Sequence, residues 1–163
     1  MPADVTLHPS LEAKASSEEV RGLLEQLDTW AAGVLGAVEA ADAELSVMLC
    51  SDAAIQALNG EWRGKEVPTD VLSFPQGDMP PGAPRHLGDV VISLDTAMRQ
   101  ATEQGHSLAQ EMAVLLVHGV LHLLGHDHDE AAERARMHAE EQRLLAALGG
   151  GGGLIERAGG QVG

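Results

Sequence analysis

Apolar side chains recur along the chain with two periods, a period of two that predicts strands and a longer one that predicts helices. Alternation over residues 3–7 and over Glu44–Cys50 predicts two strands, and the compact apolar run Gly88–Ser93 predicts a third. Residues 67–74 predict a further strand or extended segment, which Pro68 interrupts early because proline has no N–H to donate. The pattern therefore predicts about four strands.

Helical patterning occupies most of the remaining sequence. Serine caps and early acidic residues predict helices that begin near Ser17 and Ser51 and end near Ala40 and Gly60. Further helices are predicted over 94–105, 107–124 and 130–148, and the last carries an acidic side that is expected to face solvent. The last third of the 107–124 helix, AVLLVHGVLHLL, is apolar nearly all round, which predicts that this helix is buried.

The order of these elements predicts the fold class. Strands separated by helices without strict strand–helix–strand alternation indicate an α+β (mixed α/β) fold, with about four strands packed by about five helices. The length of 163 residues fits a single domain, expected over residues 1–148. Residues 149–163 are rich in glycine and are expected to form a flexible tail.

Composition and charge narrow the functions of such a domain. The formal net charge of −15 argues against a general nucleic-acid coat protein, whose affinity would come from many Lys and Arg contacts to phosphate. Aromatic side chains make up only 2% of the chain, namely Trp30, Trp62 and Phe74. A base-stacking platform of interleaved aromatics is therefore excluded as well.

The sequence predicts a cytoplasmic protein. Cys50 is the single cysteine and cannot form an intramolecular disulfide, which favours a reducing compartment. The first residues include early acids and no apolar run of signal-peptide length, and nothing predicts a membrane span. Cys50 is not expected to be a nucleophile, because it lies in a predicted strand without a helix N-terminus or basic neighbour to activate it.

Four of the eight histidines lie in the run HGVLHLLGHDH, which has the spacing of a metal site. His118 and His122 are four apart on a predicted helix and share one face, so both imidazoles can reach one metal ion. Gly125 can reverse the chain in a left-handed conformation, and His128 then returns toward the same point. Three imidazoles leave one tetrahedral position open, as in catalytic zinc sites, although nickel, copper and cobalt also suit this donor set.

The other histidines are expected to play smaller parts. His126 directly follows the glycine, where the chain is still turning, and is not expected to be a fourth ligand. The remaining four are expected at the surface: His8, His86, His106 and His138.

The spacing of the three ligands resembles that of the metzincin zinc peptidases, with one departure. Those enzymes carry a glutamate directly after the first histidine, where it acts as the general base. Position 119 of this chain is glycine, which cannot accept a proton. A zinc peptidase therefore stays open as an alternative only if another group acts as the base.

Three motifs together resemble the YbeY family of bacterial rRNA maturation endoribonucleases. The first is HGVLHLLGHDH itself, which matches the family pattern H-G-x-L-H-L-x-G-x-D-H and has glycine where the peptidases have glutamate. The second runs from Leu58 to Phe74 and resembles L-N-x-x-[aromatic]-R followed by P-T-D-V-L-S-F. The third, Leu87–Ser93, resembles L-G-D-I-x-I-S, and the resemblance covers roughly residues 44–148 in the family's order.

The resemblance implies a site and a fold. His118, His122 and His128 would hold one Zn²⁺ per chain, with Arg63 and His118 as the catalytic residues and Arg63 contacting phosphate beside the metal. The family fold would be a small mixed sheet packed by helices, with the buried metal-bearing helix lining a cleft. One departure is His126, which stands where tyrosine is common in the family.

The resemblance also implies an activity and partners. The activity is metal-dependent endonucleolytic cleavage of single-stranded RNA, in rRNA maturation at the 16S rRNA 3′ end and in ribosome quality control. The partners would be the rRNA precursor, the small ribosomal subunit and assembly factors such as an Era-type GTPase, with no DNA and no membrane. The alternative from another class is a non-catalytic ribosome-assembly factor whose metal only stiffens the fold.

Several roles stay open from the residues alone. The general base is either a metal-bound hydroxide acting alone, Asp127 or His126. Asp70 and Asp89 either orient ligands or pin backbone turns. Asp127 and Asp129 flank the third ligand and either accept a hydrogen bond from a ligand or start the next helix.

The distribution of charge along the chain weakens the evidence that the net negative charge gives against RNA binding. Residues 62–99 carry four Lys and Arg side chains against five Asp and Glu, so most of the net charge of −15 lies elsewhere. A bound divalent metal would make the site locally positive. We therefore expect weak binding to naked RNA with a shallow salt dependence, and delivery of the substrate by the ribosome or a partner.

Overall fold

Strands and helices follow one another in the predicted order in the computed structural model, which describes residues 3–40, 42–75, 86–125 and 131–149. The strands are β1 (Ala3–Leu7), β2 (Glu44–Cys50), β3 (Val71–Pro75) and β4 (His86–Ser93). The helices are α1 (Glu18–Ala37), α2 (Asp52–Arg63), α3 (Leu94–Gln104), α4 (Leu108–Leu123) and α5 (Ala131–Gly149), with a 3-10 helix, η1, at Pro9–Lys14. None of the described helices is both long and apolar enough to cross a lipid bilayer.

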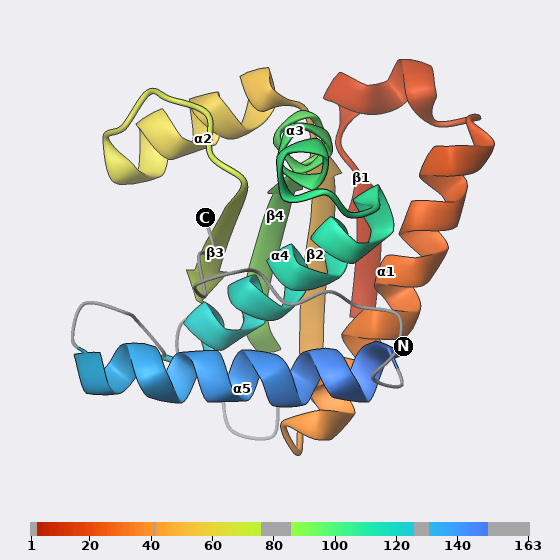
Figure 1. Cartoon of the computed structure of the whole chain (residues 1–163). Coiled ribbons are helices and arrows are strands. Elements are labelled where there is room, and N and C mark those ends of the chain that lie inside the picture. Colours follow the sequence, from red (N-terminus) through yellow and green to blue (C-terminus); the bar gives the residue numbers. More distant parts are fainter. Residues whose placement is uncertain (1–2, 41, 76–85, 126–130, 150–163) are drawn as a thin grey trace.

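The four strands form one mixed sheet in the order β1-β2-β4-β3 (Figure 1). β1, β2 and β4 are parallel, and β3 is antiparallel to β4 at one edge. The predicted mixed α+β fold of about four strands and five helices is thus confirmed. The predicted start of β3 at residue 67 is wrong, because the strand begins only at Val71, beyond Pro68.

The sheet divides the core into two unequal parts. On one face, Leu45, Val47, Val90 and Ile92 pack with buried side chains of α1, α4 and α5. Side chains alternate between the faces of a strand, so Val91 points the other way and joins a small cluster with Cys50, Leu72 and Ile55 of α2. Helix α2 and helix α4 therefore cover opposite faces of the sheet.

Helix α4 is buried along most of its length, as the sequence predicts. Every residue from Glu111 to Leu121 is buried, including the charged side chain of Glu111. Oε1 of Glu111 lies 2.6 Å from Nε2 of His106, and the two side chains are 0% and 1% exposed. The expectation that His106 lies at the surface is therefore wrong: Gly105 ends α3 in a left-handed conformation, and the turn brings His106 against the first turns of α4.

The other three histidines expected at the surface differ in exposure. His138 is exposed, and His8 and His86 are half-buried.

The N-termini of α2 and α3 are joined by hydrogen bonds to one carboxylate. Oδ1 of Asp52 accepts hydrogen bonds of 2.6 Å from both Ser93 Oγ and Thr96 Oγ1, and Oδ2 accepts one of 2.9 Å from Arg99. Burial raises the pKa of Asp52, but the hydrogen bonds and the charge of Arg99 outweigh it, so the pKa lies below its ordinary value of 3.8. The ionised form of Asp52 therefore stabilises the folded state.

We predict that Asp52→Asn lowers the free energy of unfolding by about 1–2 kcal/mol at neutral pH, because charge-assisted hydrogen bonds are lost. A lowered folded-state pKa contributes stability above the unfolded value and loses it as the pH falls through the folded value. The difference between wild type and variant in urea unfolding should therefore shrink below a pH of about 4. A difference that is constant or grows on acidification would contradict this assignment.

Candidate metal centre

His118 and His122 lie side by side on the C-terminal half of α4. Their Nε2 atoms are 2.9 Å apart, and the ring centroids are 4.5 Å apart with the planes at 71°. His118 is buried at 4% exposure, whereas His122 is half-buried. The four-residue spacing on a helix thus brings two imidazole nitrogens to one point, as the sequence predicts.

This arrangement fits two ligands of one metal ion. Ligands of a tetrahedral zinc with bonds of about 2.0–2.1 Å lie roughly 3.3 Å apart, which is close to the observed separation of the two nitrogens. The predicted third ligand, His128, lies outside the described residues, as do His126, Asp127 and Asp129. Within the described residues there is accordingly no group of three or more potential ligands, and the three-histidine set stays a prediction.

The end of α4 has the predicted form. Gly125 follows the helix with a φ of 97°, a conformation that glycine adopts without strain. Its N–H donates to the carbonyl of His122, so the chain turns immediately beyond the second histidine.

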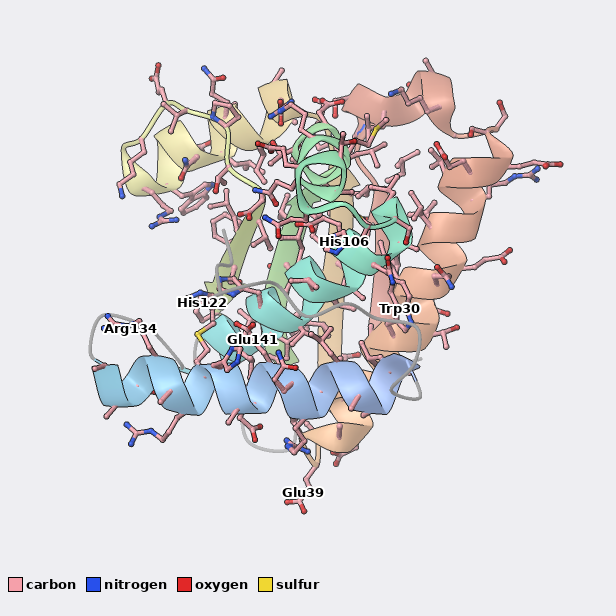
Figure 2. The ribbon with its side chains drawn as sticks, viewed as in Figure 1. Trp30, Glu39, His106, His122, Arg134 and Glu141 are labelled. Atoms are coloured by element: carbon pink, nitrogen blue, oxygen red, sulfur yellow. The ribbon has the colours of Figure 1, made fainter. Side chains whose placement is uncertain are left out.

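Glu141 of α5, which the sequence does not single out as a site residue, faces the other side of the His118 ring. Its Oε1 lies 3.5 Å from Nδ1 of His118, which is within ion-pair distance but longer than an ordinary hydrogen bond. Figure 2 labels Glu141 between α5 and α4, with His122 farther along α4. The prediction that the acidic residues of this helix face solvent is wrong for Glu141, which is 7% exposed. The sequence does contain a signal for this burial. Position 141 shares one face of the helix with Met137, Leu144 and Leu145, which are apolar and buried.

Gly119 packs against the sheet, and this explains why no glutamate stands there. A Cβ at position 119 would lie 2.7 Å from Cγ1 of Val90 and 3.3 Å from Cγ2 of Val71. The hydroxyl of Ser73 on β3 also donates to the Gly119 carbonyl at 2.9 Å. A glutamate at this position would point into the sheet rather than toward the histidines, which counts against the zinc-peptidase alternative.

Arg63 lies on the other side of the edge strand β3. It is the last residue of α2 and is exposed, and in the described part of the chain it forms no hydrogen bond or ion pair with either histidine. The neighbouring Trp62 is 65% exposed, and its ring lies 6.1 Å from that of Phe74 on β3. The structure therefore brings His118 and His122 together but does not bring Arg63 into contact with them.

A groove of about 660 Å³ lies on the same side as α2. Its lining includes Trp62, Phe74, Met48 and Asp89, with no residue of α4. The implied cleft lined by the histidine helix is therefore not this groove, and it stays a prediction.

Two other singled-out residues have structural explanations. Asp70 is 5% exposed, and its Oδ1 accepts a hydrogen bond of 2.8 Å from the N–H of Val71, so it pins the turn before β3.

Cys50 is buried, and burial together with the charges of Asp52 and Asp95 raises the pKa of its thiol to about 12. Helix α2 begins just after Cys50, as the Ser51 cap predicts, so the expectation that no helix N-terminus lies beside the thiol is wrong. The stronger effects of burial and negative charge nevertheless keep the thiol protonated.

We predict that Gly119→Ala lowers the free energy of unfolding by about 1–3 kcal/mol, because the added methyl group overpacks the interface with Val90. The matched control is Gly22→Ala in α1, where a Cβ would meet nothing within 4 Å. That variant should be more stable than wild type by up to about 1 kcal/mol, because alanine favours a helix. Urea unfolding of both variants tests the assignment, and a stabilising Gly119→Ala would contradict it.

Comparisons with known proteins place these features in a family. The family model described as Endoribonuclease YbeY matches residues 10–149. A protein named Endoribonuclease YbeY from Myxococcus xanthus is 53% identical over 79% of this chain, although the chain spans only 45% of that protein's length. Proteins of the same name from Anaeromyxobacter sp. and Moorella thermoacetica are 46% and 47% identical over 91% and 88% of the chain, and 78% and 85% of their own lengths.

The fold also resembles a solved structure. The solution structure of a protein from Thermotoga maritima superimposes with a TM-score of 0.62 at 25% identity, covering 91% of this chain and 89% of the other. The family match covers all three motifs and the elements that carry Arg63, His118 and His122. The chain therefore belongs to the YbeY family.

Proposed function

We propose that this protein is a metal-dependent endoribonuclease that cleaves single-stranded RNA during rRNA maturation. The observation that carries the proposal is the 2.9 Å approach of the His118 and His122 Nε2 atoms at the end of a buried helix. Relatives that are 53% and 46% identical to this chain are named Endoribonuclease YbeY. RNA cleavage is thus the function that both the donor set and the family support.

His118, His122 and His128 would hold the metal, which we propose to be one Zn²⁺ per chain. A bound zinc ion supplies hydroxide at neutral pH or polarises a phosphoryl oxygen. The 4% exposure of His118 and the partial exposure of His122 support a site that opens to solvent on one side only. Gly119 keeps α4 close to the sheet, so the ligands come from a rigid helix.

Arg63 would contact the phosphate backbone. Its guanidinium is planar and presents paired donors that match a phosphate group, and its exposure at the end of α2 leaves it accessible to a polymer. Because β3 lies between α2 and α4 at the sheet edge, an RNA strand that touches both Arg63 and the histidines would pass across this edge.

The substrate we propose is the small-subunit rRNA precursor near its 16S 3′ end, with a role in ribosome quality control. The net charge of −15 supports delivery of this RNA by the small ribosomal subunit and by assembly factors such as an Era-type GTPase in the cytoplasm. Residues 1–148 would form the catalytic domain, with 149–163 as a flexible tail outside it.

We predict that purified protein cleaves single-stranded RNA and that a chelator or His122→Ala abolishes the cleavage. Arg63→Ala should lower kcat/KM by about a hundredfold, because one preorganised contact to the developing phosphoryl charge is lost. Arg21→Ala, at an exposed position of α1, is the matched control and should leave the rate unchanged. Chelator-resistant cleavage, or equal rates for Arg63→Ala and Arg21→Ala, would contradict the proposal.

The same variants separate the alternatives. Mapping the 16S rRNA 3′ end in a deletion strain should show mature ends with wild type and precursor ends with Arg63→Ala. Equal rescue by folded Arg63→Ala and His122→Ala proteins would indicate a non-catalytic assembly factor. Metal-dependent turnover of a peptide library without RNA cleavage would indicate a peptidase.

A further inference from the structure

Glu141 is a carboxylate on a face of α5 that otherwise presents apolar side chains to the core. Met137, Leu144 and Leu145 on this face are 2%, 0% and 6% exposed, and Glu141 itself is 7% exposed. A carboxylate is almost never buried to this extent unless a partner compensates for its lost hydration. The burial of Glu141 therefore calls for a specific partner.

The ring of His118 is that partner. Oε1 of Glu141 lies 3.5 Å from Nδ1 of His118, with the two side chains 9% and 6% exposed. Nε2, on the other side of the same ring, lies 2.9 Å from Nε2 of His122. The two nitrogens of His118 thus face different neighbours, one on α5 and one on α4 itself.

A neutral imidazole carries one N–H and one lone pair, and which nitrogen carries the proton depends on the neighbours. A carboxylate beside Nδ1 favours the proton on that atom, because it attracts the N–H dipole and would repel a lone pair. The lone pair is then left on Nε2, the atom that faces His122. Carboxylates commonly orient metal-binding histidines in this way.

We propose that Glu141 is a positioning residue that holds the proton of His118 on Nδ1 and orients the ring, so that the Nε2 lone pair points to the position shared with His122. This inference rests on the proposed function, since the shared position is the proposed metal site. Glu141 acts only through His118 and touches neither metal nor substrate.

The neighbouring Glu140 provides a matched control. Its carboxylate pairs with Arg143 at 2.7 Å on the outer side of α5, where the two side chains are 33% and 49% exposed. Glu140→Gln therefore removes one negative charge from the same helix turn without changing the surroundings of His118. Glu141→Gln makes the same chemical change on the buried side.

The first experiment measures zinc affinity by competition with a chromophoric chelator. Glu141→Gln should bind Zn²⁺ at least about tenfold more weakly than wild type, as is usual when the outer partner of a metal-binding histidine is lost. Glu140→Gln should bind like wild type. Glu141→Asp, which keeps the charge but moves it, should give an intermediate affinity and serves if Glu141→Gln does not fold.

The second experiment needs no metal. Long-range ¹H–¹⁵N correlation spectra of the metal-free protein at alkaline pH should place the His118 proton on Nδ1 in wild type and Glu140→Gln. In Glu141→Gln a substantial fraction should move to Nε2. A proton already on Nε2 in wild type, or no change in the variant, would overturn the proposal.

The two measurements also separate this inference from the proposed function. Wild type that binds zinc and cleaves RNA, with Glu141→Gln equal to wild type in affinity, overturns only the role of Glu141. Wild type that binds no zinc overturns the metal site and with it this role, whatever the tautomer. Equal loss of affinity in Glu140→Gln and Glu141→Gln would indicate a general charge effect and would likewise overturn the positioning role.

Discussion

Helix α4 lies against the sheet without a side chain at Gly119, and a Cβ there would come within 2.7 Å of Val90. This close contact fixes both the depth and the rotation of the helix. Each residue of an α-helix is turned by about 100° from the one before it. Because position 119 faces the sheet, position 118 is turned away from it and meets α5 at Glu141.

The rest of the candidate site depends on that rotation. His122 lies one turn beyond His118 on the same side, so the two rings approach each other and Gly125 turns the chain directly after them. The burial of residues 111–121 leaves α4 little freedom to move relative to the sheet. Burying the polar nitrogens of two adjacent imidazoles costs free energy if the rings serve only to pack the helix. We therefore interpret the pair as a functional site.

The parts that could be predicted from the sequence are those set by local patterns. The period of apolar residues predicts α4 and β2, and the i, i+4 spacing predicts that His118 and His122 meet. The parts that could not be predicted depend on contacts between distant segments. His106 is buried because a turn folds it against Glu111, Glu141 is buried because α5 packs on α4, and Arg63 lies across β3 because α2 packs on the face of the sheet opposite α4.

The candidate site depends on one metal ion at the point where the two imidazole nitrogens of α4 converge. Zinc-edge X-ray absorption on the purified protein, loaded with one equivalent of Zn²⁺, measures the ligands directly. We predict three imidazole nitrogens at about 2.0–2.1 Å in wild type and the loss of one in His122→Ala. Sulfur in the first shell, or a spectrum that is the same in wild type and His122→Ala, would contradict it.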